Sequence, residues 1–315
     1  MKNSILAPSI IALALFLNGC NDNYSGNTST ASTPTITPTT PRSTTIPAQD
    51  YAISDFYQID DNLNSPNQDA REMFLVLHYT ALPLDETLKR FMDSSYGASS
   101  HYLVPELRQG QNFTVYSLEP ENRRAWHAGV SYWQGNRNIN ASSIGIEIEN
   151  LGFPSADETI PLMQRRWYPF SSKEQIEVLA SVIKDITQRY NISPSRIIGH
   201  SDVAPGRKFD PGPLFPWEEL YKQHNIGAWF DDDTANFYRT YSPWSGNISE
   251  LQIKLALYGY DVPNNDTLDQ ATQNAVSAFQ MHFYPEKYDG IPDTETVARL
   301  DALLEKYRGQ ARPKI

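Results

Sequence analysis

The sequence has one cysteine among 315 residues, which excludes a disulfide framework and a cysteine-rich metal site. Basic residues are also scarce: 26 Lys and Arg face 37 Asp and Glu, and the formal charge of −11 argues against nucleic acid as the main partner. A single apolar stretch, Ile5 to Leu17, is too short to span a bilayer, so a polytopic membrane protein is excluded. Apolar residues still make up 40%, and the length suits about two folded domains.

The N-terminus has the pattern of an export signal. Lys2 supplies a positive charge, and the apolar run that follows ends in small residues before Cys20. This junction resembles the lipobox of bacterial lipoproteins, in which the cysteine becomes the first residue and is acylated. We therefore predict a lipoprotein signal peptide over residues 1–19 and lipidation of Cys20; an ordinary signal peptide is the alternative. Asn21 then favours an outer-membrane protein that faces the periplasm.

Residues 20–48 are dominated by Thr, Ser and Pro. Such a segment has too little apolar area to offset the entropy of ordering, and its prolines favour extended chain. We interpret it as a tether that lets the folded part reach away from a membrane.

Residues 49–228 predict an α/β domain with a mixed central sheet covered by helices. Strands are expected at Glu72–Tyr79, around Phe113–Tyr116, at Ser143–Glu149 and at Arg196–Gly199. Helices are expected at Leu84–Ser94 and, after a capping box of Ser172 and Gln175, as far as Tyr190. In the third strand the isoleucines alternate with Gly145, Glu147 and Glu149, so these three side chains share the opposite face.

Two histidines and an aspartate stand where a site is expected. His78 and His200 each end a strand, and Asp210 follows in a proline-rich loop. Two imidazoles and a carboxylate form a catalytic zinc set that leaves one position for water. Spacing alone equally allows three unrelated residues. A different alternative is the iron-binding triad of oxygenases, built from His200, Asp202 and a distal histidine, but that site needs a β-barrel.

Five segments, in order from Glu72 to Trp217, resemble the type-2 N-acetylmuramoyl-L-alanine amidases, a family related to peptidoglycan recognition proteins. They are Leu77-His78-Tyr79, Arg124-Ala-Trp-His-Ala-Gly-Val-Ser131, Ser143-Ile-Gly-Ile-Glu-Ile-Glu149, Gly199-His-Ser-Asp-Val-Ala-Pro-Gly-Arg-Lys208 and Asp210-Pro-Gly-Pro213.

The resemblance implies a zinc hydrolase that cleaves the amide between N-acetylmuramic acid and the L-alanine of the stem peptide. It assigns one Zn²⁺ per chain to His78, His200 and Asp210. It makes Glu147 the catalytic acid/base and Lys208 the cation that stabilises the transition state. The implied partners are peptidoglycan and muropeptides. The alternative is a non-catalytic recognition lipoprotein, but a pure binder does not need an activated water.

His101, Trp126 and His127 are further candidates for substrate contact. His101 resembles a family position that lines the site, with a buried structural role as its alternative, and Trp126 has packing as its alternative. Glu149 shares the face of Glu147 and is expected to be a solvated carboxylate, with support of Glu147 as its alternative. Asp202 is expected to be structural, and His224 and His282 are expected to be surface residues.

The remaining chain predicts a connector over residues 229–244 and a three-helix domain over 245–315. The helices are expected from Ile248, over Asp269–Phe283 and from a Thr294 cap to Leu304. Their arrangement resembles the small peptidoglycan-binding domain of wall hydrolases; a helical appendage is the alternative.

Overall fold

The computed structural model describes residues 62–63 and 65–314. The chain divides into two units, Met1–Ile53 and Ser54–Ile315, and every described residue belongs to the second. The predicted signal peptide, Cys20 and the tether lie outside the described residues. Within the described ranges, none of the helices combines the length and the apolarity of a membrane span.

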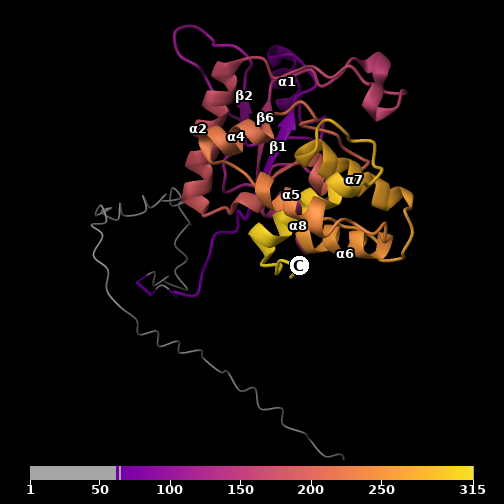
Figure 1. The fold of residues 1–315 in the computed structure, drawn as a ribbon. Coiled ribbons are helices and arrows are strands. Elements are labelled where there is room, and N and C mark those ends of the chain that lie inside the picture. The colour runs from indigo at the N-terminus through magenta and orange to yellow at the C-terminus, as the bar shows by residue number, and fades with distance from the viewer. Residues whose placement is uncertain (1–61, 64, 315) are drawn as a thin grey trace, which may run out of the picture. The chain divides into compact units, whose positions relative to one another are not determined.

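A five-stranded mixed sheet forms the centre of the fold, in the order β3-β2-β6-β1-β7. Figure 1 labels its strands β1, β2 and β6. The strands of the sheet are β1 (Phe74–Tyr79), β2 (Tyr102–Val104), β3 (Tyr116–Ser117), β6 (Ser143–Ile148) and β7 (Ile197–Gly199). All neighbours are parallel except β2 and β3. The predicted fold class is therefore confirmed.

The two central strands are buried because both faces of the sheet are covered. Every residue of β6 is buried, as are the first five of β1. Their register places His78 opposite Glu147, so two residues with predicted chemistry are neighbours near the carboxyl ends of the strands. The sheet thus brings the predicted acid/base next to a predicted metal ligand.

Helices α1 (Leu84–Phe91), α2 (Lys173–Tyr190) and α4 (Trp217–His224) complete this part of the fold. The apolar stripe of α2 enters the core, as its spacing predicts. Ser172 caps α2 by accepting the Gln175 amide N–H, but the Gln175 side chain donates to the carbonyls of Val104 and Glu149 instead of returning to Ser172. Half of the predicted capping box therefore forms.

Shorter elements carry the connections. The hairpin strands are β4 (Tyr132–Trp133) and β5 (Asn136–Arg137), and the short helix α3 (His200–Val203) follows β7 directly. Single 3₁₀ turns occupy Ile139–Ala141, Ser155–Asp157, Leu162–Gln164 and Pro194–Arg196.

Four helices make up the C-terminal part: α5 (Asp232–Tyr241), α6 (Ile248–Tyr258), α7 (Gln270–Phe283) and α8 (Thr294–Arg308). Figure 1 shows them gathered into one group. The segment predicted as a connector contains α5, which packs against α8. Helix α8 is capped by Asp293, whose side chain accepts the Thr296 N–H, so the predicted Thr294 cap is wrong.

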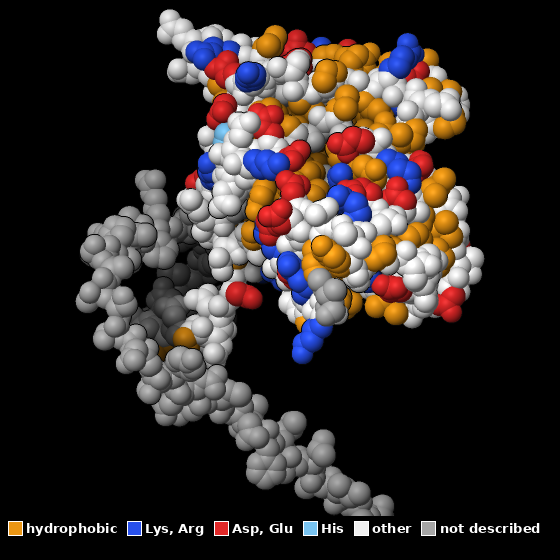
Figure 2. Space-filling model, in the orientation of Figure 1, with side chains coloured by type: hydrophobic (Ala, Val, Ile, Leu, Met, Phe, Trp, Pro, Cys, Tyr) orange, Lys and Arg blue, Asp and Glu red, His pale blue; other side chains and the backbone are white. Residues whose placement is uncertain are grey.

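One hydrophobic core extends from the sheet into these helices without interruption. Outside the core, acidic and basic side chains of the described residues are interspersed over the face shown in Figure 2.

Candidate active site

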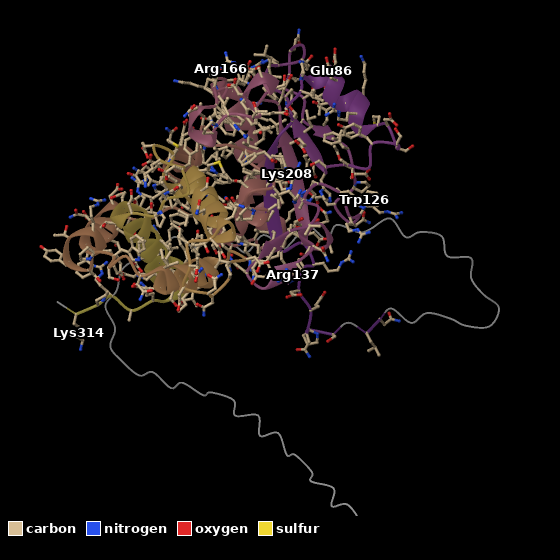
Figure 3. All side chains as sticks on the ribbon, turned by 90° about the vertical axis from the view of Figure 1, so that its right-hand side faces the viewer. Glu86, Trp126, Arg137, Arg166, Lys208 and Lys314 are labelled. Carbon is tan, nitrogen blue, oxygen red and sulfur yellow. The ribbon has the colours of Figure 1, made fainter. Side chains whose placement is uncertain are left out.

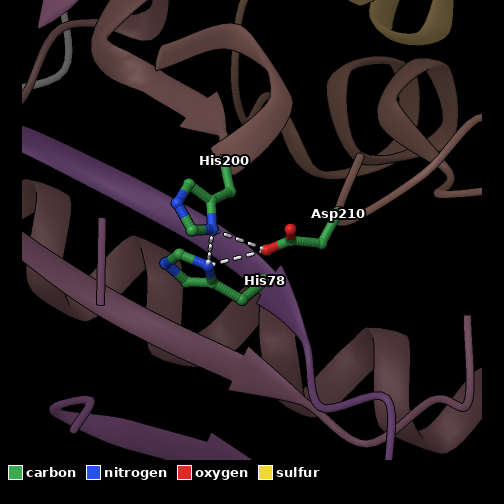
Figure 4. A group of neighbouring side chains, drawn as sticks. All are labelled: His78, His200 and Asp210. Atoms are coloured by element: carbon green, nitrogen blue, oxygen red, sulfur yellow. Dashed lines mark hydrogen bonds and ion pairs between the residues drawn. The ribbon is translucent and has the colours of Figure 1, made fainter. Parts of the chain in front are cut away.

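Three predicted ligands meet at one point (Figure 4). The Nδ1 atoms of His78 and His200 lie 3.0 Å apart, and Asp210 Oδ2 lies 2.8 Å from the first and 3.0 Å from the second. All three side chains are buried. The predicted convergence of two imidazoles and a carboxylate is present in the fold.

The order of the strands in the sheet and the glycine at position 199 explain why the three ligands converge. Strands β1 and β7 are parallel neighbours, so His78 and His200 emerge at the same edge of the sheet. The loop then returns Asp210 to this edge: its carbonyl accepts the Ser201 N–H at 2.8 Å. A Cβ on Gly199 would stand 2.7 Å from Pro211 Cδ, so only glycine lets the loop come this close.

A chain of hydrogen bonds determines which ring nitrogen of His78 carries the proton. Ser143 donates its hydroxyl to the Ile139 carbonyl at 2.7 Å, so its Oγ accepts from His127 Nε2 at 3.1 Å. His127 Nδ1 is then an acceptor for the Nε2–H of His78, 3.0 Å away. His78 Nδ1 therefore carries a lone pair, as a metal ligand must.

The second histidine is oriented in the same manner. His200 Nε2 donates to the Ala128 carbonyl at 3.1 Å, and in the neutral tautomer that makes this bond the lone pair is on Nδ1. Arg207 donates to the same carbonyl at 2.6 Å and to that of Val130 at 2.7 Å. The Arg207 guanidinium, which also lines the pocket, thus holds the carbonyl to which His200 donates.

The donor set fits a metal ion. Two bare imidazole nitrogens and a carboxylate oxygen within 3.0 Å of one another repel unless a cation lies between them. Burial and the field of His200 lower the pKa of His78 to about 4, so its ring is neutral at physiological pH.

Glu147 has the environment of a proton-transfer group. Its side chain is buried, and it accepts no hydrogen bond from the described residues. Burial raises the pKa of Glu147 well above its ordinary value, the charge of Asp210 raises it further, and Lys208 opposes both. A carboxyl group with this pKa exchanges protons nearer to neutral pH than an exposed one does.

A pocket of about 400 Å³ opens beside the cluster. Glu147, the exposed Lys208 and the half-exposed Trp126 all line it, the last two labelled in Figure 3. Arg90 also lines it, with its guanidinium 4.4 Å from the ring centre of Tyr96. The pocket therefore brings together the predicted acid/base, the predicted cation and one predicted substrate contact.

The other two predicted substrate contacts, His127 and His101, are buried. His127 borders the pocket but is buried behind His78, with its ring packed over Gly145. His101 is fully buried: its Nδ1 accepts the Gly145 N–H at 2.9 Å and its Nε2 donates to the Arg123 carbonyl at 3.0 Å. The prediction that His101 lines the site is wrong, because both nitrogens are occupied by backbone.

Several secondary expectations also change. Glu149 is no solvated carboxylate, because its two oxygens accept the N–H groups of Leu84 and Glu106, each at 2.7 Å. His224 is partly buried, with 11% of its side chain exposed. His282, expected on the surface, is buried and bonded to Asp202 at 2.8 Å.

The structural role expected for Asp202 is confirmed, and this also rules out the iron-triad alternative. Its carboxylate does not join the cluster of His78, His200 and Asp210 but accepts hydrogen bonds from Gly199, Tyr260 and His282.

Two supporting residues escaped prediction from the sequence. Arg207 stands within a segment that carries the family resemblance, and this adjacency was the available signal. Ser143, which fixes the direction of the hydrogen bonds behind His78, begins a strand like any other buried serine, so no local pattern marks it.

Comparison with known proteins agrees with the geometry. Residues 68–213 match the family described as N-acetylmuramoyl-L-alanine amidase, and residues 245–300 match a peptidoglycan binding domain. The N-acetylmuramoyl-L-alanine amidase AmiD of Escherichia coli is 42% identical over 80% of this chain and 89% of its own length.

Solved structures give the same answer over most of the chain. The Escherichia coli AmiD structure, a complex with the substrate anhydro-N-acetylmuramic acid-L-Ala-D-gamma-Glu-L-Lys, has a TM-score of 0.72 at 40% identity and covers 81% of this chain and 97% of that one. AmpDH3 of Pseudomonas aeruginosa has a TM-score of 0.71 at 40% identity, with 80% and 99% covered. With its ligand cluster, its pocket and its sequence in agreement, this chain belongs to the N-acetylmuramoyl-L-alanine amidase family.

Proposed function

We propose that this protein hydrolyses the amide between N-acetylmuramic acid and the L-alanine of the peptidoglycan stem peptide, with one zinc ion per chain. The observation that carries the proposal is the cluster of donor atoms on His78, His200 and Asp210 beside the carboxyl group of Glu147, which accepts no hydrogen bond from the described residues. Family membership supports the reaction, and the substrate in the related AmiD complex contains the corresponding sugar and alanine.

Zinc suits the donor set for chemical reasons. It binds imidazole nitrogen and carboxylate oxygen at about 2.0–2.2 Å, and three protein ligands are its usual complement in catalytic sites. Tetrahedral bonds of that length place ligand atoms about 3.3–3.6 Å apart. The observed separations of 2.8–3.0 Å are shorter than this by less than about 1 Å, so small side-chain movements suffice.

The protein residues divide the proton and charge transfers between them. A bound Zn²⁺ supplies Lewis-acid polarisation of a carbonyl and lowers the pKa of water to about 7. Glu147 accepts the proton of the attacking water and passes it to the leaving nitrogen, for which its raised pKa is suited. Lys208 brings a positive charge to the oxyanion, and removal of one such donor typically costs about 10²–10³ in rate. Trp126 offers an aromatic face to sugar or peptide at the edge of the pocket.

A passive recognition protein is the second candidate, and Glu147 argues against it. A buried, unpartnered carboxyl group destabilises the fold when it is ionised, so a protein that only binds has no use for one.

The rest of the chain extends the proposal to location and wall contact. We infer that Cys20 is lipidated and anchors the protein to the outer membrane on its periplasmic side, with residues 20–48 as tether. The match of residues 245–300 to a peptidoglycan binding domain supports a role for the C-terminal helices in holding the cell wall.

Mass analysis of muropeptide digests tests the reaction directly. We expect products separated at the lactyl amide, loss of activity on exhaustive chelation, and recovery when zinc is added. The matched control is Glu147→Gln, which keeps the size of the side chain and should retain zinc without turnover. Activity that survives complete chelation, or cleavage at another bond, would refute the proposal.

A further inference from the structure

A buried polar cluster joins the C-terminal helices to the segment that carries His200. Asp202 Oδ1 accepts the hydroxyl of Tyr260 at 2.6 Å, and Asp202 Oδ2 accepts His282 Nδ1–H at 2.8 Å. Oδ2 also accepts the Gly199 N–H at 2.8 Å. The three side chains are each at most 4% exposed, so water does not compete for these bonds. Loss of either donor would leave a buried charge short of a partner.

A hydrogen bond of Asp202 connects the two sides of His200 in the sequence. Gly199 precedes the ligand and Asp202 follows it by two residues, so the carboxylate closes the turn on which His200 stands. Helix α3 has only four residues and cannot hold this geometry alone. The position of the ligand ring therefore depends on what holds Asp202.

His282 is itself held firmly from both parts of the fold. Its ring stacks between Trp217, at the start of α4, and Phe283, with ring centres 3.8 Å and 3.9 Å away. Tyr260 packs against Trp133 of the β4–β5 hairpin, with ring centres 4.9 Å apart. Both donors to Asp202 are thus rigid, which makes them suited to positioning rather than to simple burial.

We propose that Tyr260 and His282, both outside the amidase match, are positioning residues that orient the metal ligand His200 through Asp202. The wall-binding part of the chain is then also part of the support of the metal centre. This inference rests on the proposed zinc site. Groups that orient metal ligands from behind typically contribute about 10–100-fold in metal affinity.

Zinc affinity, measured on the full chain by competition with a chromophoric chelator, provides the test. We expect Tyr260→Phe and His282→Ala to weaken zinc binding by about 10–100-fold. His282→Asn, whose amide offers a donor close to the position of Nδ1, should restore affinity to near the parent value. Backbone amide exchange at 199–203 should be faster in the metal-free Tyr260→Phe protein than in the metal-free parent.

Tyr307→Phe is the matched control. Its hydroxyl bonds to Trp229, so it also ties α8 to the preceding segment through a tyrosine, but it does not contact Asp202. It should leave zinc affinity unchanged. Equal affinities in the parent and in Tyr260→Phe, or an equal loss in Tyr307→Phe, would overturn the inference while leaving the proposed function intact. A parent chain that binds no zinc would overturn both.

Discussion

Gly145 lies beneath the imidazole of His127, and alanine at this position would place a methyl group too close to that ring. The added Cβ would stand 2.6 Å from His127 Cγ and 2.8 Å from Cδ2 and Nδ1. Ordinary contact begins near 3.4 Å, so the ring must move by about 0.8 Å. This movement would carry His127 out of line with His78 and with Ser143.

Two effects of Gly145→Ala can be sized from this geometry. Forcing an extra methyl group into a packed site costs about 1–3 kcal/mol of folding free energy. Displacing the acceptor of the His78 Nε2–H removes the group that orients this ligand, for which a loss of about 10–100-fold in zinc affinity is typical. Both follow from one collision, so they should appear together.

Urea unfolding of the metal-free protein and chelator competition for zinc measure the two effects. The matched background is His127→Ala, in which the ring is gone and the methyl group has room. There, Gly145→Ala should cost less than about 0.5 kcal/mol, the usual error of additivity. If Gly145→Ala destabilises the His127→Ala protein as much as the parent, or if the single variant binds zinc like the parent, the reasoning is refuted.

Further predictions concern Glu147, Lys208 and Cys20. Glu147→Gln should lower kcat by at least about 10² with zinc content unchanged. Because burial raises the pKa of Glu147, the carboxyl stabilises the fold fully only below its ordinary value of 4.5 and loses this contribution as the pH rises. The metal-free Glu147→Gln protein should therefore have a higher Tm than the metal-free parent at pH 7, and the two Tm values should be equal near pH 4. Equal Tm values at pH 7 would contradict a free-energy cost of burying the ionised carboxyl group. Lys208 lowers the pKa of Glu147, so Lys208→Met should move the acidic limb of the kcat/KM profile to higher pH as well as slow the reaction, and an unmoved limb would exclude the coupling. Cys20→Ala should release the protein from membranes on fractionation, and continued sedimentation with lipid would contradict lipidation.

Local patterns were sufficient for the elements that build the site. The apolar run through Val76 and the alternation through Ile146 mark central strands, and a histidine at a strand end marks a sheet edge where ligands gather. These local patterns did not predict which histidine rings are buried. His282 has an ordinary place in its helix, and its burial depends on Asp202, 80 residues earlier in the chain.

The roles of neighbouring polar residues were hidden for the same reason. Glu149 and Glu147 are on the same face of their strand, so the two-residue alternation of side chains predicts the same surroundings for both. In the fold, the Glu149 carboxylate accepts two backbone N–H groups, while Glu147 lines the pocket and accepts no hydrogen bond within the part of the chain that the structure describes. The difference arises because the backbone N–H groups of Leu84 and Glu106 lie next to Glu149. The sequence of β6 does not reveal which distant segments will lie beside it.

Because one core runs from the sheet into the C-terminal helices, we expect the regions of the two family matches to unfold together. Heat should melt them in a single calorimetric transition, and limited proteolysis should not liberate a stable C-terminal fragment. Exchanging these helices for those of another wall protein would expose an apolar surface on the hydrolase half. Under the proposed wall contact, substitutions that change wall preference would therefore be expected on the outward surfaces of α6, α7 and α8, where side chains can vary without disturbing the sheet.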